Sequence, residues 1–200
     1  MNIILVTRHI YPFAYPGGGS YNSYCLIRVF DKLGLHVKLV VLSAPVSAKV
    51  ISETLKLHNT EVYVISKTAT KVESNWYKLL KIFKEELKSS SSILLFQNMP
   101  GNFLSKEFSI LLSARTIAPN WKRLSVIHTS ILHELNFSNK DYVHKIVHLT
   151  TYSLWKRYSQ YFIAVSNLIK KQLIEEGVDP SRISVIHNGV NTQMLETIKS

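Results

Sequence analysis

Short apolar runs alternate with longer segments of helical period along the whole chain. The runs lie near residues 3–7, 37–42, 61–65, 93–97, 124–128, 162–165 and 183–186. Most are apolar throughout, which is typical of strands that helices cover on both faces of a parallel sheet. The alternation predicts an α/β fold, a Rossmann-like parallel β-sheet flanked by helices.

The segments between the runs carry helix signals. In the first of them the apolar side chains fall on one helical face, and Gly34 follows where a residue with positive φ closes a helix. This face consists of Tyr21, Cys25, Leu26, Val29, Phe30 and Leu33. Further helices are expected near residues 47–58, 76–88, 103–116 and 141–158. The last helix has Ser166 as its N-cap, Leu168, Ile169 and Leu173 as its buried stripe, and Gly177 as its end.

The composition limits the size and location of the protein. The chain has 200 residues, of which 46% are hydrophobic and 18% are charged, as in a globular protein of one domain. Its apolar runs are far shorter than the ~20 residues of a membrane-spanning helix, and the N-terminus does not read as a secretory signal, so we expect a cytoplasmic protein. Cys25 is the single cysteine, which excludes an intramolecular disulfide and a multi-cysteine metal centre.

An excess of basic residues indicates an anionic ligand or surface. The chain has 24 Lys and Arg against 13 Asp and Glu, a formal net charge of +11. Nucleic acid is not expected as a partner, because no helix-turn-helix, RNA-binding strand motif or zinc-finger spacing occurs. Residues 76–88 mix apolar and Lys positions as an interfacial helix does, which leaves a peripheral membrane contact open, although a sheet-covering helix is favoured.

The candidate chemistry lies where the strands end, because open parallel sheets bind ligands beyond the carboxyl ends of their strands. Gly17, Gly18 and Gly19 precede the first helix, where backbone N–H groups could approach a phosphate. The pattern is neither the Rossmann nor the Walker A motif, which argues against NAD binding and ATP hydrolysis. A flexible turn without a ligand is the alternative for this triplet.

Two of the eight histidines have a spacing that a metal site can use. His144 and His148 stand four residues apart in an expected helix, but the H-E-x-x-H motif is absent, so a solvated helix face is favoured and no metal site is expected. His128 is the last residue of the fifth expected strand. That position is consistent with a role in a ligand cleft or with a structural histidine at a strand end.

Two segments together resemble a known family. Residues 12–37 run from P-F-A-Y-P-G-G-G-S to L-G-L-H-V, and residues 162–191 run from F-I-A-V-S to I-S-V-I-H-N-G-V-N. They are similar to the opening and the close of the N-terminal domain of family 4 glycosyltransferases, which are retaining enzymes of the GT-B fold. Two positions depart from the pattern: the family's G-H-x-V is G-L-H-V here, and Asn191 replaces its usual Asp.

The resemblance implies that residues 1–190 form the acceptor-side half of such an enzyme and that residues 191–200 begin an interdomain linker. The family's C-terminal domain, which binds the donor and carries a glutamate pair spaced E-x₇-E, would have to be supplied in cis or in trans. Glu53 and Glu61 match that spacing, but we expect them in a helix and the following strand of this domain, so the match is accidental.

The resemblance also implies roles for individual residues. The Gly17–Gly19 loop would lie against the donor diphosphate, and His128 would face the transferring sugar. Tyr15, Asn98, Gly101 and Ser166 would border the acceptor, a glycan or a lipid-linked molecule, and Asn188 and Gly189 would lie between the domains. The nucleotide sugar is then a substrate, and neither a metal nor another cofactor is expected. In addition, Tyr11, Phe13 and Tyr15 should form an aromatic cleft wall.

Two other functions are compatible with parts of the sequence. A nucleotide-sugar epimerase shares this architecture but needs carboxylates in the cleft, and none stands out at the strand ends. A non-catalytic subunit that recruits an acceptor or a partner stays open.

Overall fold

A parallel sheet forms the centre of the molecule. The computed structural model describes residues 2–13, 18–66, 92–97, 106–129 and 142–189. Within these ranges the strands pair in the order β3-β2-β1-β4-β5-β6-β7, every pair parallel. Their bounds are β1 Asn2–Thr7, β2 Val37–Val41, β3 Thr60–Val64, β4 Ser92–Phe96, β5 Lys122–Ile127, β6 Tyr161–Ala164 and β7 Ile183–Val185. The predicted Rossmann-like sheet is confirmed.

The strand order changes direction at β1. This strand lies between β2 and β4, with Leu5 in register with Leu39 on one side and with Leu95 on the other. The chain first builds outward through β2 and β3 and then continues from β4 on the opposite side of β1. In open α/β sheets such a switch point leaves a crevice beyond the carboxyl ends of the two central strands, which is where ligands bind.

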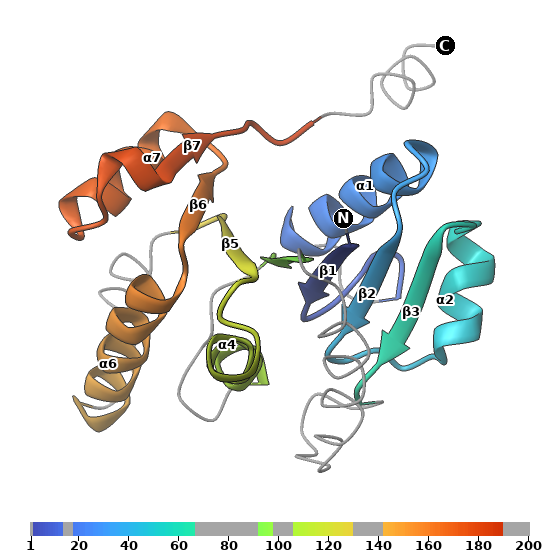
Figure 1. Cartoon of the computed structure of the whole chain (residues 1–200), viewed down its shortest axis with the longest axis horizontal. Helices are drawn as coiled ribbons and strands as arrows, with labels where there is room; N and C mark the ends of the chain where they lie inside the picture. Colours follow the sequence, from blue (N-terminus) through green and yellow to red (C-terminus); the bar gives the residue numbers. More distant parts are fainter. Residues whose placement is uncertain (1, 14–17, 67–91, 98–105, 130–141, 190–200) are drawn as a thin grey trace.

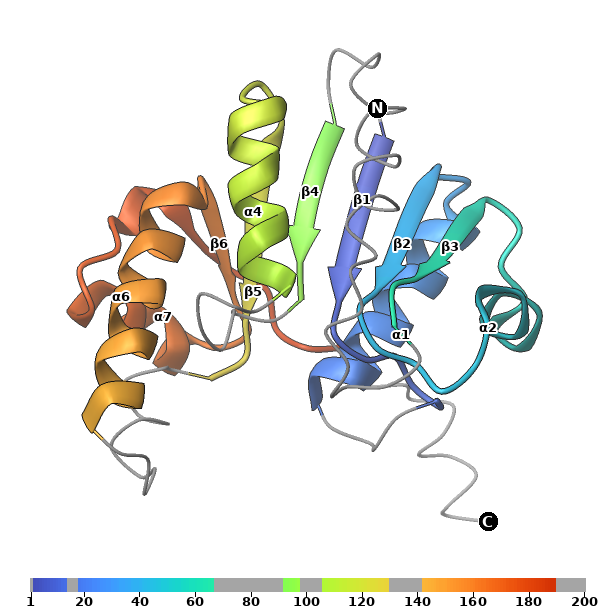
Figure 2. The ribbon, with the colours of Figure 1, turned by 90° about the horizontal axis from the view of Figure 1, so that it is seen from below.

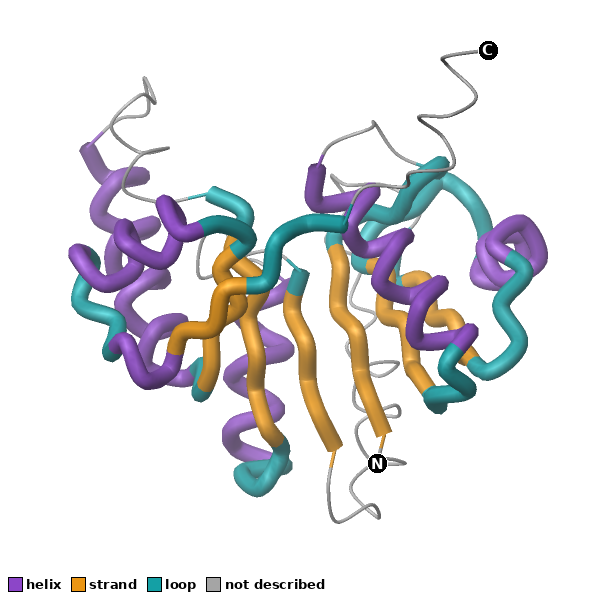
Figure 3. Tube along the Cα trace, turned by 90° about the horizontal axis from the view of Figure 1, so that it is seen from above, coloured by secondary structure: helices purple, strands orange, loops and turns teal. Residues whose placement is uncertain are grey.

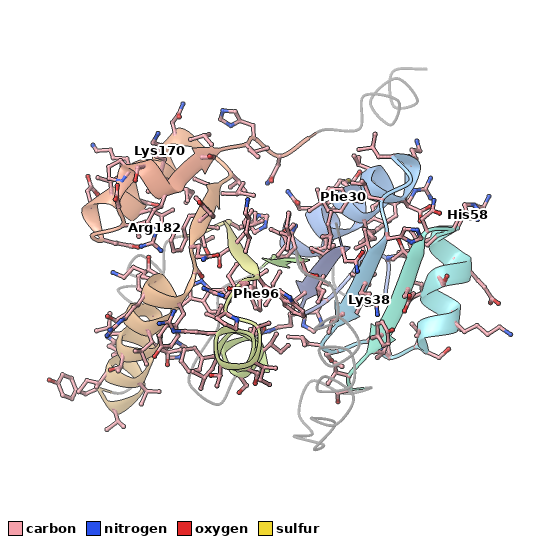
Figure 4. All side chains as sticks on the ribbon, in the orientation of Figure 1. Phe30, Lys38, His58, Phe96, Lys170 and Arg182 are labelled. Atoms are coloured by element: carbon pink, nitrogen blue, oxygen red, sulfur yellow. The ribbon has the colours of Figure 1, made fainter. Side chains whose placement is uncertain are left out.

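Helices cover both faces of the sheet. On one face lie α1, Gly18–Lys32, and α2, Ala48–Leu55; on the other lie α4, Lys106–Ile117, α6, Tyr142–Tyr158, and α7, Asn167–Glu175 (Figures 1 and 2). A short 3₁₀ helix, Pro180–Arg182, precedes β7. Phe96 lies on the α4 side (Figure 4) and meets Trp155 of α6 edge-on, with ring centroids 4.8 Å apart. The helix expected at 76–88 falls outside the described residues.

The helix ends follow the expected local chemistry. Gly34 and Gly177 have φ of 69° and 84°, the left-handed conformation that glycine adopts without steric cost. The Ser166 hydroxyl accepts a hydrogen bond from the Ile169 N–H at 3.2 Å and caps α7, as predicted. One end differs: α2 stops at Leu55 instead of residue 58, because Lys56 adopts a left-handed conformation with φ of 51°.

The apolar face of α1 is only partly buried, and the buried stripe predicted for α7 is wrong at Leu168. In α1, Ile27 is fully buried, whereas Val29 and Leu33 are 50% and 67% exposed. This helix contacts the sheet through Ile27, and part of its apolar surface faces a region that no described helix covers. In α7, Leu168 is exposed, because this helix packs on the sheet edge through Ile169 and Leu173.

None of the helices within the described ranges has the length and apolar character needed to cross a lipid bilayer.

Candidate functional site

The segment after β1 is fixed by hydrogen bonds on both sides. The Thr7 hydroxyl donates to the His9 carbonyl oxygen at 2.7 Å and lies 2.9 Å from the Ser23 hydroxyl of α1. The Ser43 N–H, beyond the end of β2, donates to the Arg8 carbonyl oxygen at 3.0 Å. The backbone at the switch point is therefore held in one arrangement, and its side chains start from fixed positions.

Gln97 and His128 connect the ends of β4 and β5. Gln97 is completely buried, and its N–H donates to the Val6 carbonyl oxygen of β1 at 2.9 Å. Its side-chain Oε1 lies 3.4 Å from His128 Nε2. Burial lowers the pKa of His128, so the imidazole is neutral at physiological pH and can donate one hydrogen bond and accept another. Gln97 Nε2 is buried and has no hydrogen-bond partner among the described residues.

The glycine triplet leads into the start of α1. Gly18 and Gly19 lie in the first turn of this helix, and neither is among the positive-φ residues. The Gly19 carbonyl oxygen accepts a hydrogen bond from the Ser23 hydroxyl at 2.8 Å. The first N–H groups of a helix have no intrahelical acceptor, so this end offers donors to an anion. Gly17 lies outside the described residues.

Ser166 stands at the end of the strand next to His128. The Val165 N–H donates to the Ile127 carbonyl oxygen at 3.3 Å, which keeps the ends of β5 and β6 side by side. The Ser166 hydroxyl caps α7, so its position is accounted for by helix capping. The other residues expected at the acceptor, Tyr15, Asn98 and Gly101, fall outside the described part of the chain.

An apolar groove of about 470 Å³ lies between α1 and the segment that follows β7. Figure 3 shows this segment crossing above the strand ends toward α1, and Asn22 of α1 donates to the Asn188 side-chain oxygen. The groove is lined by Tyr21, Asn22, Cys25, Leu26, Val29, Phe30, Leu95, Gln97, Val126, Ile163, Val165 and 186–189. Asn188 and Gly189, the expected interdomain residues, thus form one edge of it.

Tyr11 and Phe13, two of the three residues predicted for an aromatic cleft wall, lie within the described residues, and neither lines the groove. The Tyr11 ring lies 5.7 Å from the Tyr21 ring and 5.6 Å from the Tyr24 ring, centroid to centroid, in edge-on contacts. Tyr11 therefore packs against α1 instead of standing free. Phe13 is half-buried against the same core.

Two further patterns can be located. Glu53 lies on α2 and Glu61 on β3, as expected for an accidental spacing match in this domain. Among the residues that the structure describes, no group of three or more His, Cys, Asp or Glu could hold a metal ion. His148 belongs to α6.

Three residues at or near the carboxyl ends of the strands were not predicted from the sequence: Gln97, Arg8 and Glu107. Gln97 was assigned to a strand, although a polar residue that ends an apolar run was a signal. Arg8 directly follows β1, and its ion pair with Glu107 of α4, at 2.8 Å, joins positions 99 residues apart. The local sequence around Arg8 and Glu107 contains no pattern that predicts this contact.

Comparison with known proteins places these features in a family. The profile of Glycosyltransferase Family 4 matches residues 16–194. A search of curated proteins finds no significant match.

Solved structures share the fold at low identity. Anabaena Alr3699/HepE in complex with UDP and glucose is 16% identical, with a TM-score of 0.60, over 97% of this chain and 46% of its own. The lipopolysaccharide outer core galactosyltransferase WaaB is 16% identical, with a TM-score of 0.57, over 96% and 46%. UDP-GlcNAc 2-epimerase from Methanocaldococcus jannaschii is 18% identical, with a TM-score of 0.57, over 94% and 46%.

The present chain spans less than half the length of these proteins, and its sheet corresponds to one half of the GT-B fold. Because the family profile covers most of the sequence, the assignment does not depend on the fold alone. The chain belongs to Glycosyltransferase Family 4.

Proposed function

We propose that this chain is the acceptor-side half of a retaining hexosyltransferase, which moves a sugar from a nucleotide-sugar donor to a glycan or lipid-linked acceptor. The observation that carries this proposal is the sheet edge at the switch point, where the buried Gln97 side chain lies beside a neutral His128. The proposed domain is residues 1–190, followed by the start of a linker at 191–200.

The donor is proposed from the family and from relatives. HepE has been solved with UDP, with UDP-glucose, and with UDP and glucose. In this chain the start of α1 would receive the donor diphosphate, because helix N-termini carry free N–H donors and a partial positive charge. Stabilising the leaving diphosphate in this way lowers the barrier to its departure, and the proposed reaction uses no metal.

His128 would act on the transferring sugar. A neutral imidazole next to Gln97 can form one hydrogen bond to a sugar hydroxyl without bringing a charge into the site. In a retaining transfer without a protein nucleophile, much of the rate comes from holding donor and acceptor in reactive geometry. Ser166, and the acceptor residues outside the described ranges, would border the acceptor.

The chain would need a second half for activity. The groove between α1 and residues 186–189 has an apolar floor formed by strands β4 to β6, whereas parallel sheets are normally covered on both faces. We propose that the donor-binding half, which accounts for the rest of the relatives' length, covers this groove and closes over the strand ends. The complete enzyme would work in the cytoplasm, in peripheral contact with an anionic membrane surface through the net positive charge of this chain.

The epimerase is the less favoured function. No carboxylate follows the carboxyl end of any of the seven strands within the described residues. Glu107 of α4 is buried and paired with Arg8. Proton abstraction from a sugar carbon would need such a base.

A transfer assay tests the proposal. The chain is incubated with radiolabelled UDP-, GDP- and ADP-sugars and a membrane glycolipid extract, alone and with a donor-binding half of the family supplied in cis or in trans. We expect transfer only by the pair, with the anomeric configuration of the donor retained in the product. Robust transfer by the chain alone, or no transfer by a pair that binds donor, would contradict it; the second result would favour a non-catalytic recruiting subunit.

A further inference from the structure

Arg8 occupies a fixed position at the switch point of the sheet. It directly follows β1, and its carbonyl oxygen accepts the Ser43 N–H at 3.0 Å. The residue before it is also held, because the Thr7 carbonyl oxygen accepts the Leu42 N–H at 2.9 Å. Because the backbone of Arg8 is already fixed, ligand binding costs little conformational entropy beyond that of the side-chain torsions.

The buried carboxylate of Glu107 fixes the orientation of the Arg8 guanidinium. Arg8 Nε donates to Glu107 Oε1 at 2.8 Å, and the two side chains are 45% and 4% exposed. Glu107 lies in the first turn of α4. This contact uses Nε, and no other hydrogen bond of the Arg8 side chain occurs within the described residues.

The remaining face of the guanidinium suits an oxyanion. Its two Nη groups form a planar pair of donors, which matches the spacing of two phosphate oxygens better than a lysine ammonium does. No carboxylate follows any strand end within the described ranges, so only the buried Glu107 competes for this cation at the edge. A half-exposed, pre-oriented arginine in a ligand crevice is arranged to bind an anion.

We propose that Arg8, positioned by Glu107, binds a phosphate group of the acceptor. This inference rests on the proposed function, since it names a chemical feature of the substrate of that site. The donor diphosphate is the other possible source of phosphate. The acceptor is favoured because Arg8 turns toward α4, on the face of the sheet opposite α1, whose N-terminus is the proposed diphosphate site.

Binding to the isolated chain tests the proposal without requiring catalysis. Calorimetric or NMR titrations use glucose 1-phosphate as the acceptor-like probe and UDP as the donor-like probe, with free glucose as the uncharged control. The variants are Arg8→Ala, Arg8→Lys and Glu107→Gln, with Lys49→Ala on α2 as a matched removal of an exposed positive charge. Melting temperatures establish that each variant is folded.

We expect glucose 1-phosphate to bind at least tenfold more weakly to Arg8→Ala than to the parent, and Lys49→Ala to bind normally. Arg8→Lys should recover only part of the affinity because it lacks the paired donors, and Glu107→Gln should bind severalfold more weakly. Equal binding by folded Arg8→Ala and the parent would overturn the site. Loss of UDP binding with unchanged glucose 1-phosphate binding would overturn the acceptor assignment. A chain that binds phosphate through Arg8 but never transfers sugar would contradict the proposed function and leave this site standing.

Discussion

His128 Nε2 lies 3.4 Å from Gln97 Oε1, so a half-buried imidazole at the end of β5 is joined to a fully buried amide at the end of β4. Gln97 is itself bonded through its N–H to Val6 of β1. Gln97 therefore links the ends of β1 and β4 to the imidazole at the end of β5. Substitutions at His128 should change both the pH dependence of stability and the rate of sugar transfer.

The fold should lose stability in mild acid through His128. Burial lowers its pKa below the usual 6.5, so the unfolded chain takes up a proton before the folded chain does. The stability held above the unfolded pKa is then lost as pH falls through 6.5 toward the folded value. His128→Asn should flatten the decline of melting temperature over this window, whereas the exposed His187→Asn should not. Parallel curves for parent and His128→Asn would contradict this role of burial.

Asp31 should be a main determinant of stability at the amino end of β3. Its carboxylate, at the end of α1, accepts the His58 and Asn59 N–H groups and the Thr60 hydroxyl, the shortest bond being 2.7 Å to Asn59. Burial alone would raise the pKa of Asp31, but these hydrogen bonds outweigh it and hold the pKa low. The stabilisation is thus present above the unfolded pKa, about 3.9, and lost as pH falls through the lower folded value.

Asp31→Ala should lower the free energy of unfolding at pH 7 by about 1–3 kcal/mol, because it removes the shared acceptor of two backbone N–H groups and one hydroxyl that are partly buried. Urea unfolding measures this change, and Glu53→Ala on the exposed side of α2 serves as the control. A loss for Asp31→Ala no larger than that for the control would show that the three bonds do not hold this junction.

Substitutions at Gly18 and Gly34 should distinguish a glycine that is needed for sugar transfer from one that is needed for folding. Gly18 lies in the first turn of α1 without a positive φ, so Gly18→Ala should leave the melting temperature unchanged or slightly higher. It should nevertheless slow transfer in the two-half enzyme if a diphosphate approaches this backbone closely. Gly34→Ala should show the reverse, a cost of about 1 kcal/mol or more with normal kinetics, because its φ is 69° although a Cβ there would meet nothing within 4 Å. Identical behaviour of the two variants would remove the basis for a donor loop.

The groove should be a surface for the second half. Val29, 50% exposed, lines it, whereas Val50, 40% exposed, lies on α2 away from it. Val29→Glu should leave the chain folded and weaken its association with the donor-binding half by at least about tenfold, because a charge would be buried against apolar strands. Val50→Glu should associate normally. Size-exclusion chromatography and calorimetry of the mixed halves measure this, and equal affinities would place the interface elsewhere.

The architecture was readable from the sequence because each element carries its own local signal. The apolar runs became the strands of the sheet, and Gly34 and Gly177 close helices through backbone conformations that glycine favours. Burial was less predictable. Val29 and Leu33 continue the apolar face of α1, and only the tertiary structure shows that this side of the helix is not covered by described chain.

The candidate site, too, could be predicted from the sequence only in part. His128 and Ser166 could be named because they directly follow strands whose ends meet at one edge of a parallel sheet. The Arg8–Glu107 pair and the buried Gln97 amide depend on contacts between distant parts of the chain. A sequence pattern records which residues follow a strand but not which partner holds each of them.

The most direct measurement of the central claim is the kcat of His128→Ala in the reconstituted two-half enzyme, recorded together with its melting temperature. If the strand-end histidine contacts the transferring sugar, kcat should fall by at least about tenfold, the equivalent of one hydrogen bond of ~1.4 kcal/mol in the transition state, while the melting temperature at pH 7.5 stays within a few degrees of the parent. A strongly destabilised variant whose remaining folded fraction transfers sugar at the parent rate would contradict the account, because His128 would then be a structural residue.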